Sequence, residues 1–240
     1  VDILGALANT GSRFAPYPAT VADNPLAPAI THFPWNTLFQ AVRHFGIYHQ
    51  KIAVVRNSGG YVAYCGGIDL NPDRLDDANH LHRSPYHDVH CRIEGPAVRD
   101  LAITFEERWA RDGGGSPVAI GTPSAASLGT PGGNVVQVAR TYFQAADASR
   151  RLAFAPEGDR TILDTMLKAI TAAREFIYVE DQYLTPPTAY RTALLNKVTS
   201  GEIRKLIVAI PGVVDQPFGD IVRTGLINGL RAADAGRGIV

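Results

Sequence analysis

The sequence predicts an α/β protein, and three observations lead to that fold class. Strand-like runs precede an amphipathic helix in the first half of the chain. From residue 135 onward, strand-like runs alternate with helical patterns of 11 to 14 residues, which is typical of a mostly parallel sheet covered by helices. The chain has 240 residues, 45% of them hydrophobic, which is enough for a full core without disulfides.

The first predicted elements are two strands that form a hairpin. Residues 1–34 contain five prolines and no sustained periodicity, which indicates a loop-rich segment. Ile52–Val55 and Tyr61–Tyr64 are β-branched and aromatic runs. The Asn-Ser-Gly-Gly sequence between them tolerates positive φ, so the three segments predict two strands joined by a tight turn.

A third strand and a helix are expected next. Asp88–Ile93 follows a polar stretch and has a strand-like composition. Pro96 then opens a helix that ends at the glycines 113–115. Its apolar residues recur every fourth position, at Ala97, Leu101, Phe105 and Trp109. The pattern predicts strands followed by a covering helix.

A segment poor in apolar residues separates the two halves. Between Gly113 and Gly133, 15 of 21 residues are Gly, Pro, Ser or Thr, which predicts a loop or linker. We therefore expect a first lobe over residues 1–112, a linker over 113–133 and a second lobe over 134–240. The second lobe is expected to contain the strand Val135–Arg140, the helix Arg160–Ala173, the strand Phe176–Val179, the helix Ala189–Thr199, the strand Leu206–Ile210 and the helix Ile221–Ala233.

Composition argues against several classes of protein. The 23 basic and 23 acidic residues give no net charge, so a nucleic-acid partner is not expected. Cys65 and Cys91 are too few for a disulfide framework and lack CxxC spacing. No apolar run is long enough to span a bilayer, and the N-terminus lacks the pattern of a signal peptide. We expect a soluble or peripheral membrane protein, in a compartment that the sequence leaves open.

Two side chains beside a predicted strand indicate phosphoryl chemistry. His49 and Lys51 are two residues apart and project from the same face of an extended strand. A lysine ammonium can hold phosphate oxygens and favours a neutral imidazole, which can attack phosphorus. Alone the pair is a weak signal, because such triplets also occur by chance. The sequence contains no GxGxxG, GK[ST], GxSxG or HExxH pattern to support other chemistries.

The surrounding segments resemble the phospholipase D superfamily. The run from Tyr48 to Leu70 is similar to its first HKD motif, His-x-Lys-x4-Asp, followed by a Gly-Gly-Ile-Asp turn. Similar segments follow in family order over about residues 43 to 211: Tyr86–Ala97, Phe105–Trp109, Val136–Thr141 and Phe176–Tyr183. The sequences Gly-Gly-Ile-Asp-Leu and Ile-Glu-Gly-Pro-Ala resemble the lipid-acting branch.

The resemblance implies an α/β fold, with one phospholipase D-like lobe whose mixed sheet is covered by helices, and the first part of a second similar lobe. It also implies a phosphodiesterase that works through a phosphohistidine, with no cofactor and no metal. From their positions in the motif, the resemblance implies that His49 is the nucleophile or the general acid and that Lys51 binds the phosphate oxygens. Asp88 matches the residue that orients the histidine, although a strand-end cap would also explain it.

Further residues are expected to contact the substrate. Gly66 and Gly67 let the backbone approach the site, and Asp69 belongs to the same turn. Glu180-Asp181-Gln182 ends a predicted strand, so Gln182 could reach the cleft or lie on a solvated strand end. The aromatic residues Trp35, Phe45, Tyr48 and Tyr86 could contact acyl chains or a choline headgroup, although core packing is the default for such side chains.

Two departures from the family pattern bear on activity. Arg56 stands where the motif has Asp. No histidine follows His90, so a second HKD motif is absent from the sequence. We expect either a fragment, which also fits a chain that begins with Val1, or a dimer that pairs two His49 side chains. In either case the missing C-terminal part or a second copy is needed to complete the site.

Several residues of the kinds that bind metal ions follow the first motif. His80, His82, His87, His90 and Cys91 lie within twelve residues, beside Asp76 and Asp77. Because they lack the paired spacing of zinc sites, a polar loop at the rim of the cleft is the favoured interpretation.

The sequence therefore predicts a phosphodiesterase that hydrolyses or transphosphatidylates a glycerophospholipid at a membrane surface, inactive as a lone half-site. One alternative is a non-catalytic lobe that binds phospholipid headgroups or a partner. Another is a nuclease or cardiolipin-synthase-like member of the same superfamily, against which the neutral charge argues.

Overall fold

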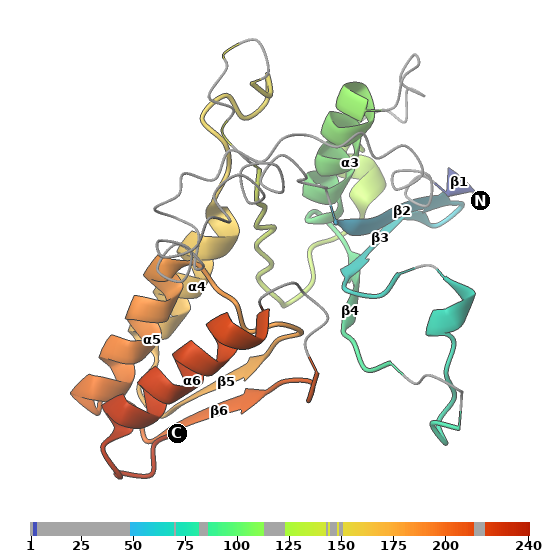
Figure 1. Ribbon diagram of the computed structural model, residues 1–240. Helices are drawn as coiled ribbons and strands as arrows, with labels where there is room; N and C mark the ends of the chain where they lie inside the picture. The colour runs from blue at the N-terminus through green and yellow to red at the C-terminus, as the bar shows by residue number, and fades with distance from the viewer. Residues whose placement is uncertain are drawn as a thin grey trace. The chain divides into compact units, whose positions relative to one another are not determined.

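The computed structural model describes residues 2–3, 49–69, 71–81, 86–112, 123–142, 144, 148, 151–213 and 219–240 (Figure 1). The predicted loop-rich segment 1–34, apart from residues 2–3, lies outside this part of the chain. So do Trp35, Phe45, Tyr48, His82 and most of the glycine-rich start of the predicted linker.

The described residues fall into two compact units. The first includes the chain from His49 to Val138, and the second includes the chain from Ala139 to Val240. Each contains strands and helices, so the α/β class predicted from the sequence is confirmed. The lobe and linker boundaries proposed above stay a prediction.

The first unit is built on an antiparallel sheet with strand order β1-β2-β3-β4. The strands are β1 (Asp2–Ile3), β2 (Lys51–Asn57), β3 (Gly60–Gly66) and β4 (His90–Glu94). The hairpin of β2 and β3 is confirmed, with Asn57 opposite Gly60 at the turn. The third strand begins two residues later than expected.

One face of this sheet packs on α3 (Val98–Asp112) (Figure 1). Its core combines β-branched and small residues of the hairpin with apolar residues of the helix: Val54, Ala63, Val98, Leu101, Ala102 and Leu128. The predicted helix is confirmed, because its four-residue periodicity buries Leu101 and Phe105.

Two short 3-10 helices complete the first unit, η2 (Pro72–Arg74) and η3 (Ala125–Leu128). Leu128 is 6% exposed and joins the core beside α3. The described end of the Gly/Pro/Ser-rich segment therefore packs on the sheet, although its composition predicted little packing.

The predicted strand Val135–Arg140 is wrong: among the described residues, this segment forms no β-ladder. Val135 is fully exposed, and the nearest bridge joins Tyr142 to Asp159. The β-branched composition favours an extended backbone, but a strand also needs a partner that exchanges hydrogen bonds with it.

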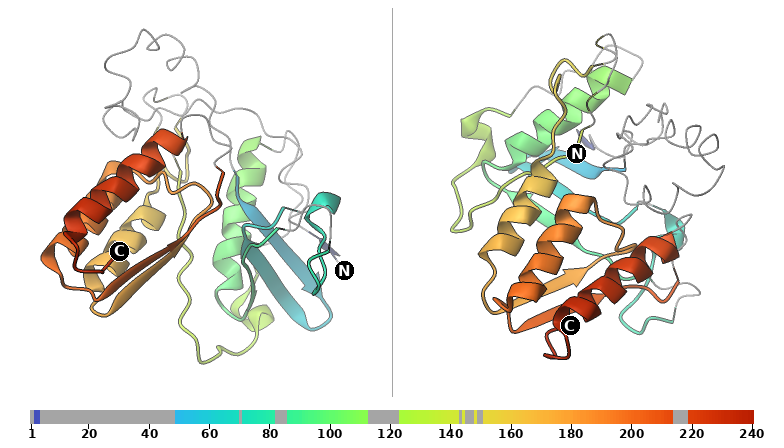
Figure 2. Two further views of the ribbon diagram at one scale, coloured as in Figure 1. Left: turned by 60° about the horizontal axis from the view of Figure 1, so that its bottom comes forward. Right: turned by 60° about the vertical axis from the view of Figure 1, so that its left-hand side comes forward.

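The second unit alternates helices and parallel strands as predicted. Its elements are α4 (Thr161–Ala172), β5 (Phe176–Glu180), α5 (Thr188–Ser200), β6 (Lys205–Ala209) and α6 (Gly219–Asp234). Strands β5 and β6 pair in parallel, and the three helices lie on one face of this sheet (Figures 1 and 2).

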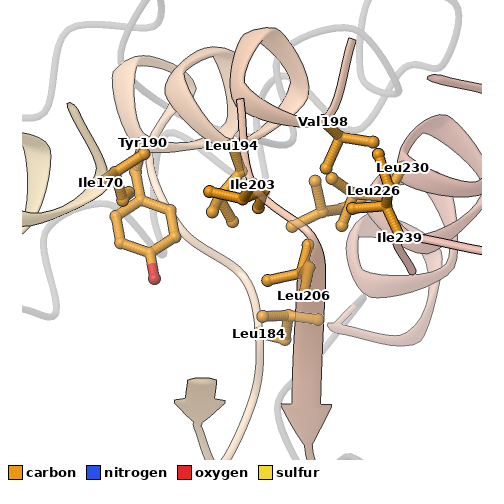
Figure 3. Packing of buried hydrophobic residues seen from close by; sticks show 10 residues of the cluster. All are labelled: Ile170, Leu184, Tyr190, Leu194, Val198, Ile203, Leu206, Leu226, Leu230 and Ile239. Carbon is orange, nitrogen blue, oxygen red and sulfur yellow. The ribbon is translucent and has the colours of Figure 1, made fainter. Parts of the chain in front are cut away.

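The core of the second unit lies between the helices and the sheet (Figure 3). Leu206 of β6 points toward Leu194 of α5 and Leu226 of α6, and all three are at most 2% exposed. On the opposite face of the sheet, Phe176, Tyr178 and Ile207 are exposed within the described structure.

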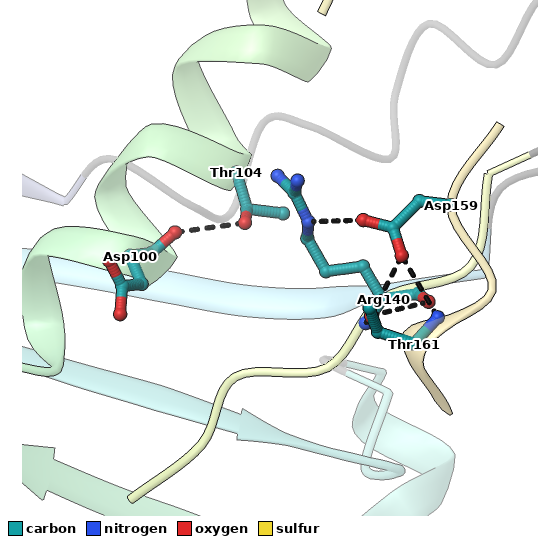
Figure 4. Close-up of polar contacts among 5 residues, drawn as sticks. All are labelled: Asp100, Thr104, Arg140, Asp159 and Thr161. Atoms are coloured by element: carbon teal, nitrogen blue, oxygen red, sulfur yellow. Dashed lines mark hydrogen bonds and ion pairs between the residues drawn. The ribbon is translucent and has the colours of Figure 1, made fainter. Parts of the chain in front are cut away.

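A polar network anchors the chain before α4 (Figure 4). The Asp159 carboxylate accepts hydrogen bonds from Nε of Arg140 at 3.2 Å and from the Thr161 hydroxyl at 2.7 Å. These contacts lower the pKa of Asp159, although burial of its carboxyl acts to raise it. In the first unit, the Thr104 hydroxyl donates to the backbone oxygen of Asp100, one turn earlier in α3 (Figure 4).

Within the part of the chain that the structure describes, no helix is both long enough and apolar enough to cross a membrane.

Candidate functional site

The candidate site lies where the chain enters β2. His49 and Gln50 precede the strand, and Lys51 is its first residue. In the sheet, Lys51 is opposite Gly66, and Gly66 is opposite His90. Because directly opposite residues of antiparallel strands share a face, Lys51 and His90 lie on the same face with only a glycine between them.

Three acceptors surround the Lys51 ammonium, which is largely buried. Its Nζ lies 2.6 Å from Nε2 of His49, 3.3 Å from the His49 backbone oxygen and 3.1 Å from Oδ1 of Asp69. An ammonium has three protons and no lone pair, so it donates to each of them. The His49 Nε2 lone pair therefore points at the Lys51 cation.

Asp69 is the counter-ion of the site. Besides Lys51, its carboxylate contacts the guanidinium of Arg74 at 3.5 Å. Burial acts to raise the pKa of Asp69, but the hydrogen bond and charge of Lys51, helped by His49 and Arg74, hold that pKa below its ordinary value. Asp69 is thus ionised at neutral pH and keeps the Lys51 ammonium in place.

Gln50 ties the motif to the helix that covers the sheet. Its Oε1 accepts a hydrogen bond of 3.0 Å from the Arg108 guanidinium, which α3 carries and which is 6% exposed. Since side chains alternate along an extended chain, Gln50 points away from the face of His49 and Lys51. The hydrogen bond from α3 therefore fixes Gln50, and with it the backbone that carries His49 and Lys51.

The two glycines let β4 and the residues before it come close to β3. A Cβ on Gly66 would lie 2.5 Å from Cα of His90 and 2.7 Å from its Nδ1. A Cβ on Gly67 would lie 2.6 Å from Cγ of Asp88, while the Gly67 N–H donates to the Val89 oxygen at 3.0 Å. A larger residue at position 66 would require backbone movement at Val89 and His90, whereas one at position 67 would displace the Asp88 side chain.

Asp88 lies beside Gly67, and its Oδ1 accepts a hydrogen bond of 2.7 Å from the Val89 N–H. Its role in orienting His49 stays a prediction. Gln182 follows β5 in the second unit and is exposed, so its contact with substrate also stays a prediction.

His90 lies at the site, although the sequence indicated it only as one of several possible metal ligands. Its Nδ1 is buried and has no hydrogen-bond partner among the described residues. A buried ring nitrogen without a partner is unusual in a folded protein. The signal was in the sequence as the second histidine of His-Asp-Val-His, but only the strand register places it opposite Gly66 and Lys51.

Among the residues that the structure describes, the His, Cys and Asp side chains after the first motif do not converge on one point. His80 pairs with Asp76 at 2.7 Å, with its own side chain 74% exposed. In the described part of the chain, no group of three or more His, Cys, Asp or Glu side chains could hold a metal ion.

Comparison with known proteins shows the same family twice. The profile of the phospholipase D family matches residues 81–190, a segment that includes Asp88, His90 and Gln182. Phospholipase D alpha 2 of Arabidopsis thaliana is 28% identical, and the match covers 68% of this chain. The chain is therefore similar to the phospholipase D family over this segment.

Other plant relatives give a similar picture. Phospholipase D alpha 2 of Oryza sativa subsp. japonica is 29% identical over 68% of this chain, and phospholipase D alpha 1 of Vigna unguiculata is 30% identical over 57% of it. The chain spans 24 to 30% of the length of these phospholipase D relatives.

Proposed function

We propose that this chain supplies one half-site of a phospholipase D-type enzyme, which cleaves a glycerophospholipid to phosphatidate and a free alcohol. The observation that carries the proposal is the 2.6 Å contact between Nε2 of His49 and Nζ of Lys51. It puts a nitrogen that can attack phosphorus beside a cation that can hold phosphate oxygens.

The first step is a displacement at phosphorus. A non-bridging phosphate oxygen takes over the Lys51 hydrogen bond to His49, which frees the Nε2 lone pair. The bond between Nε2 and phosphorus then forms while the bond between phosphorus and the headgroup oxygen breaks. Asp69 keeps the Lys51 ammonium aligned throughout, because its carboxylate is 3.1 Å from Nζ.

The second step releases the phosphoryl group. Water or another alcohol attacks phosphorus and gives its proton to the base that protonated the leaving group in the first step. The bond to Nε2 breaks and His49 is restored, which gives hydrolysis or transphosphatidylation. In the first step the leaving alkoxide needs a proton, and we propose that a second imidazole donates it. A second copy of this half-site, or another part of the protein, would supply it.

A substrate with an acidic leaving group tests the half-site by itself. Phosphatidyl-p-nitrophenol in phosphatidylcholine vesicles releases nitrophenolate without a general acid. We expect a burst of about one nitrophenolate per chain, with an acid-labile phosphoryl group on His49. The Lys51→Met variant should slow the burst by about 10²- to 10³-fold.

Two histidine variants decide the role of His49. His49→Ala should abolish both the burst and the label, whereas His80→Ala, which removes an exposed imidazole outside the site, should leave both unchanged. A burst of normal size in His49→Ala would refute the assignment.

A non-catalytic lobe that binds phospholipid headgroups is the second candidate, favoured by Arg56. Arg56 occupies the position at which the family motif has an acidic residue. Its exposed guanidinium lies 5.8 Å from the centre of the Tyr61 ring. This candidate predicts vesicle binding that is lost in Lys51→Met, without any nitrophenolate burst.

A further inference from the structure

The two cysteines of the chain lie directly opposite each other on neighbouring strands. Cys65 of β3 is paired in register with Cys91 of β4, and neither forms a disulfide in this structure. Directly opposite residues of an antiparallel pair project from the same face. The two cysteines are 26 positions apart in the chain, and no sequence pattern indicated that they pair.

The backbone geometry suits a covalent bond between these cysteines. The hydrogen bond from the Gly67 N–H to the Val89 oxygen lies two residues along the same ladder. By the alternation of antiparallel pairs, Cys65 and Cys91 are then a hydrogen-bonded pair, whose Cα atoms lie about 5.5 Å apart. Disulfides span Cα separations of about 4.4 to 6.8 Å, but their Cβ atoms lie about 3.5 to 4.5 Å apart. Because the Cβ atoms of a hydrogen-bonded pair are about 5.5 Å apart, β3 and β4 must come slightly closer at this pair when the bond forms.

The two thiols differ in access to solvent. Cys65 is half-buried and packs against the core beside α3, whereas Cys91 is exposed on β4, the outer strand of the described sheet. Burial, together with the nearby Cys91, raises the pKa of Cys65. An exposed thiol backed by a more protected one is the arrangement of an attacked and a resolving cysteine.

We propose that Cys65 and Cys91 form a redox modification site, at which a peroxide such as H₂O₂ converts the thiol pair to a cross-strand disulfide. The Cys91 thiolate attacks one peroxide oxygen, the O–O bond breaks, and Cys91 becomes a sulfenic acid with release of water. The Cys65 thiolate then attacks the Cys91 sulfur, the S–S bond forms and a second water leaves. Two thiols are oxidised by two electrons and one H₂O₂ is reduced to two H₂O.

The disulfide has a structural consequence beside the candidate site. It closes the chain between Cys65 and Cys91, which contains Asp69 and Asp88, and it fastens the outer strand β4 to β3. A cross-link of this kind removes conformations from the unfolded chain, so the oxidised protein should melt at a higher temperature. This proposal is independent of the proposed function.

Thiol titration of the 240-residue chain tests the site. After treatment of the reduced chain with H₂O₂ and removal of the excess, we expect the titratable thiols to fall from two to none. The chain should form no disulfide-linked dimer, lose the mass of two hydrogens and show a peptide cross-link between Cys65 and Cys91. The melting temperature should rise, and dithiothreitol should reverse the rise.

Two variants provide the controls. Cys91→Ser and Cys65→Ala each leave one thiol and should show no reversible rise in melting temperature, provided that their circular dichroism matches the reduced wild type. Retention of both thiols after peroxide, a disulfide-linked dimer, or over-oxidation of Cys91 with Cys65 still reduced would each overturn the proposal.

Discussion

At the scale of single residues, the site depends on how the charge of Lys51 is balanced. A largely buried ammonium is costly unless acceptors surround it, and here two of the three acceptors are an imidazole nitrogen and a carboxylate. The same three groups would serve both the proposed chemistry and the stability of the fold, because the Lys51 ammonium contacts Asp69 and His49, the proposed nucleophile.

The pKa of Asp69 makes a stability prediction that depends on pH. A carboxyl whose pKa is lowered by folding stabilises the fold above its unfolded pKa, for which the ordinary value is 3.8, and this contribution is lost as the pH falls through the folded pKa. We expect Asp69→Asn to lower the free energy of unfolding by about 1 to 3 kcal/mol at pH 7. The difference from wild type should shrink below about pH 4.

Urea unfolding at several pH values measures this difference. Glu157→Gln, which removes an exposed acidic partner of Arg151, is the matched control and should cost less than about 0.5 kcal/mol at any pH. A deficit of Asp69→Asn that stays constant down to pH 2 would contradict the assigned pKa.

At the scale of secondary structure elements, each helix is held by one apolar face. In α6, Leu226 is 1% exposed and faces the sheet, whereas Ile221 of the same helix is 59% exposed. Substitutions at these two positions therefore compare the stability cost at a buried site with that at an exposed site of the same helix.

We predict that Leu226→Ala lowers the free energy of unfolding by about 2 to 5 kcal/mol, because it leaves a cavity in the core of Figure 3. Ile221→Ala should change it by less than about 0.5 kcal/mol. Thermal or urea unfolding checks both values, and equal losses in the two variants would mean that α6 does not pack as the structure has it.

At the scale of the whole molecule, the charge balance distinguishes the possible substrates. The chain carries 23 basic and 23 acidic residues and has a sequence pI of about 7.2. Proteins that bind nucleic acid release counterions from phosphates and need a cationic surface for it. From this charge balance we predict a phospholipid rather than a polynucleotide as the phosphodiester substrate.

This charge balance leads to a binding prediction. We expect no retention of the chain on immobilised duplex or single-stranded DNA at low salt, where electrostatic binding is strongest. A salt gradient on a DNA column is the measurement. Retention that falls steeply with salt would favour the nuclease alternative within the superfamily.

The sequence by itself determined the elements whose signals are local. The hairpin of β2 and β3, the helix α3 and the alternating elements of the second unit follow from turn residues and apolar periodicity, which act between neighbours in the chain. His49 and Lys51 were found because they are two residues apart. The segment Val135–Arg140 was mispredicted because a strand depends on a partner that local composition does not specify.

Only the tertiary structure decided which distant residues meet. Asp69 reaches Lys51 through the turn after β3, Arg108 reaches Gln50 from α3, and Cys91 lies opposite Cys65 through the register of β4. These contacts join segments that 18 to 58 positions separate along the chain. Strand register and helix packing set such contacts, and both depend on the burial of shared apolar faces rather than on any short motif.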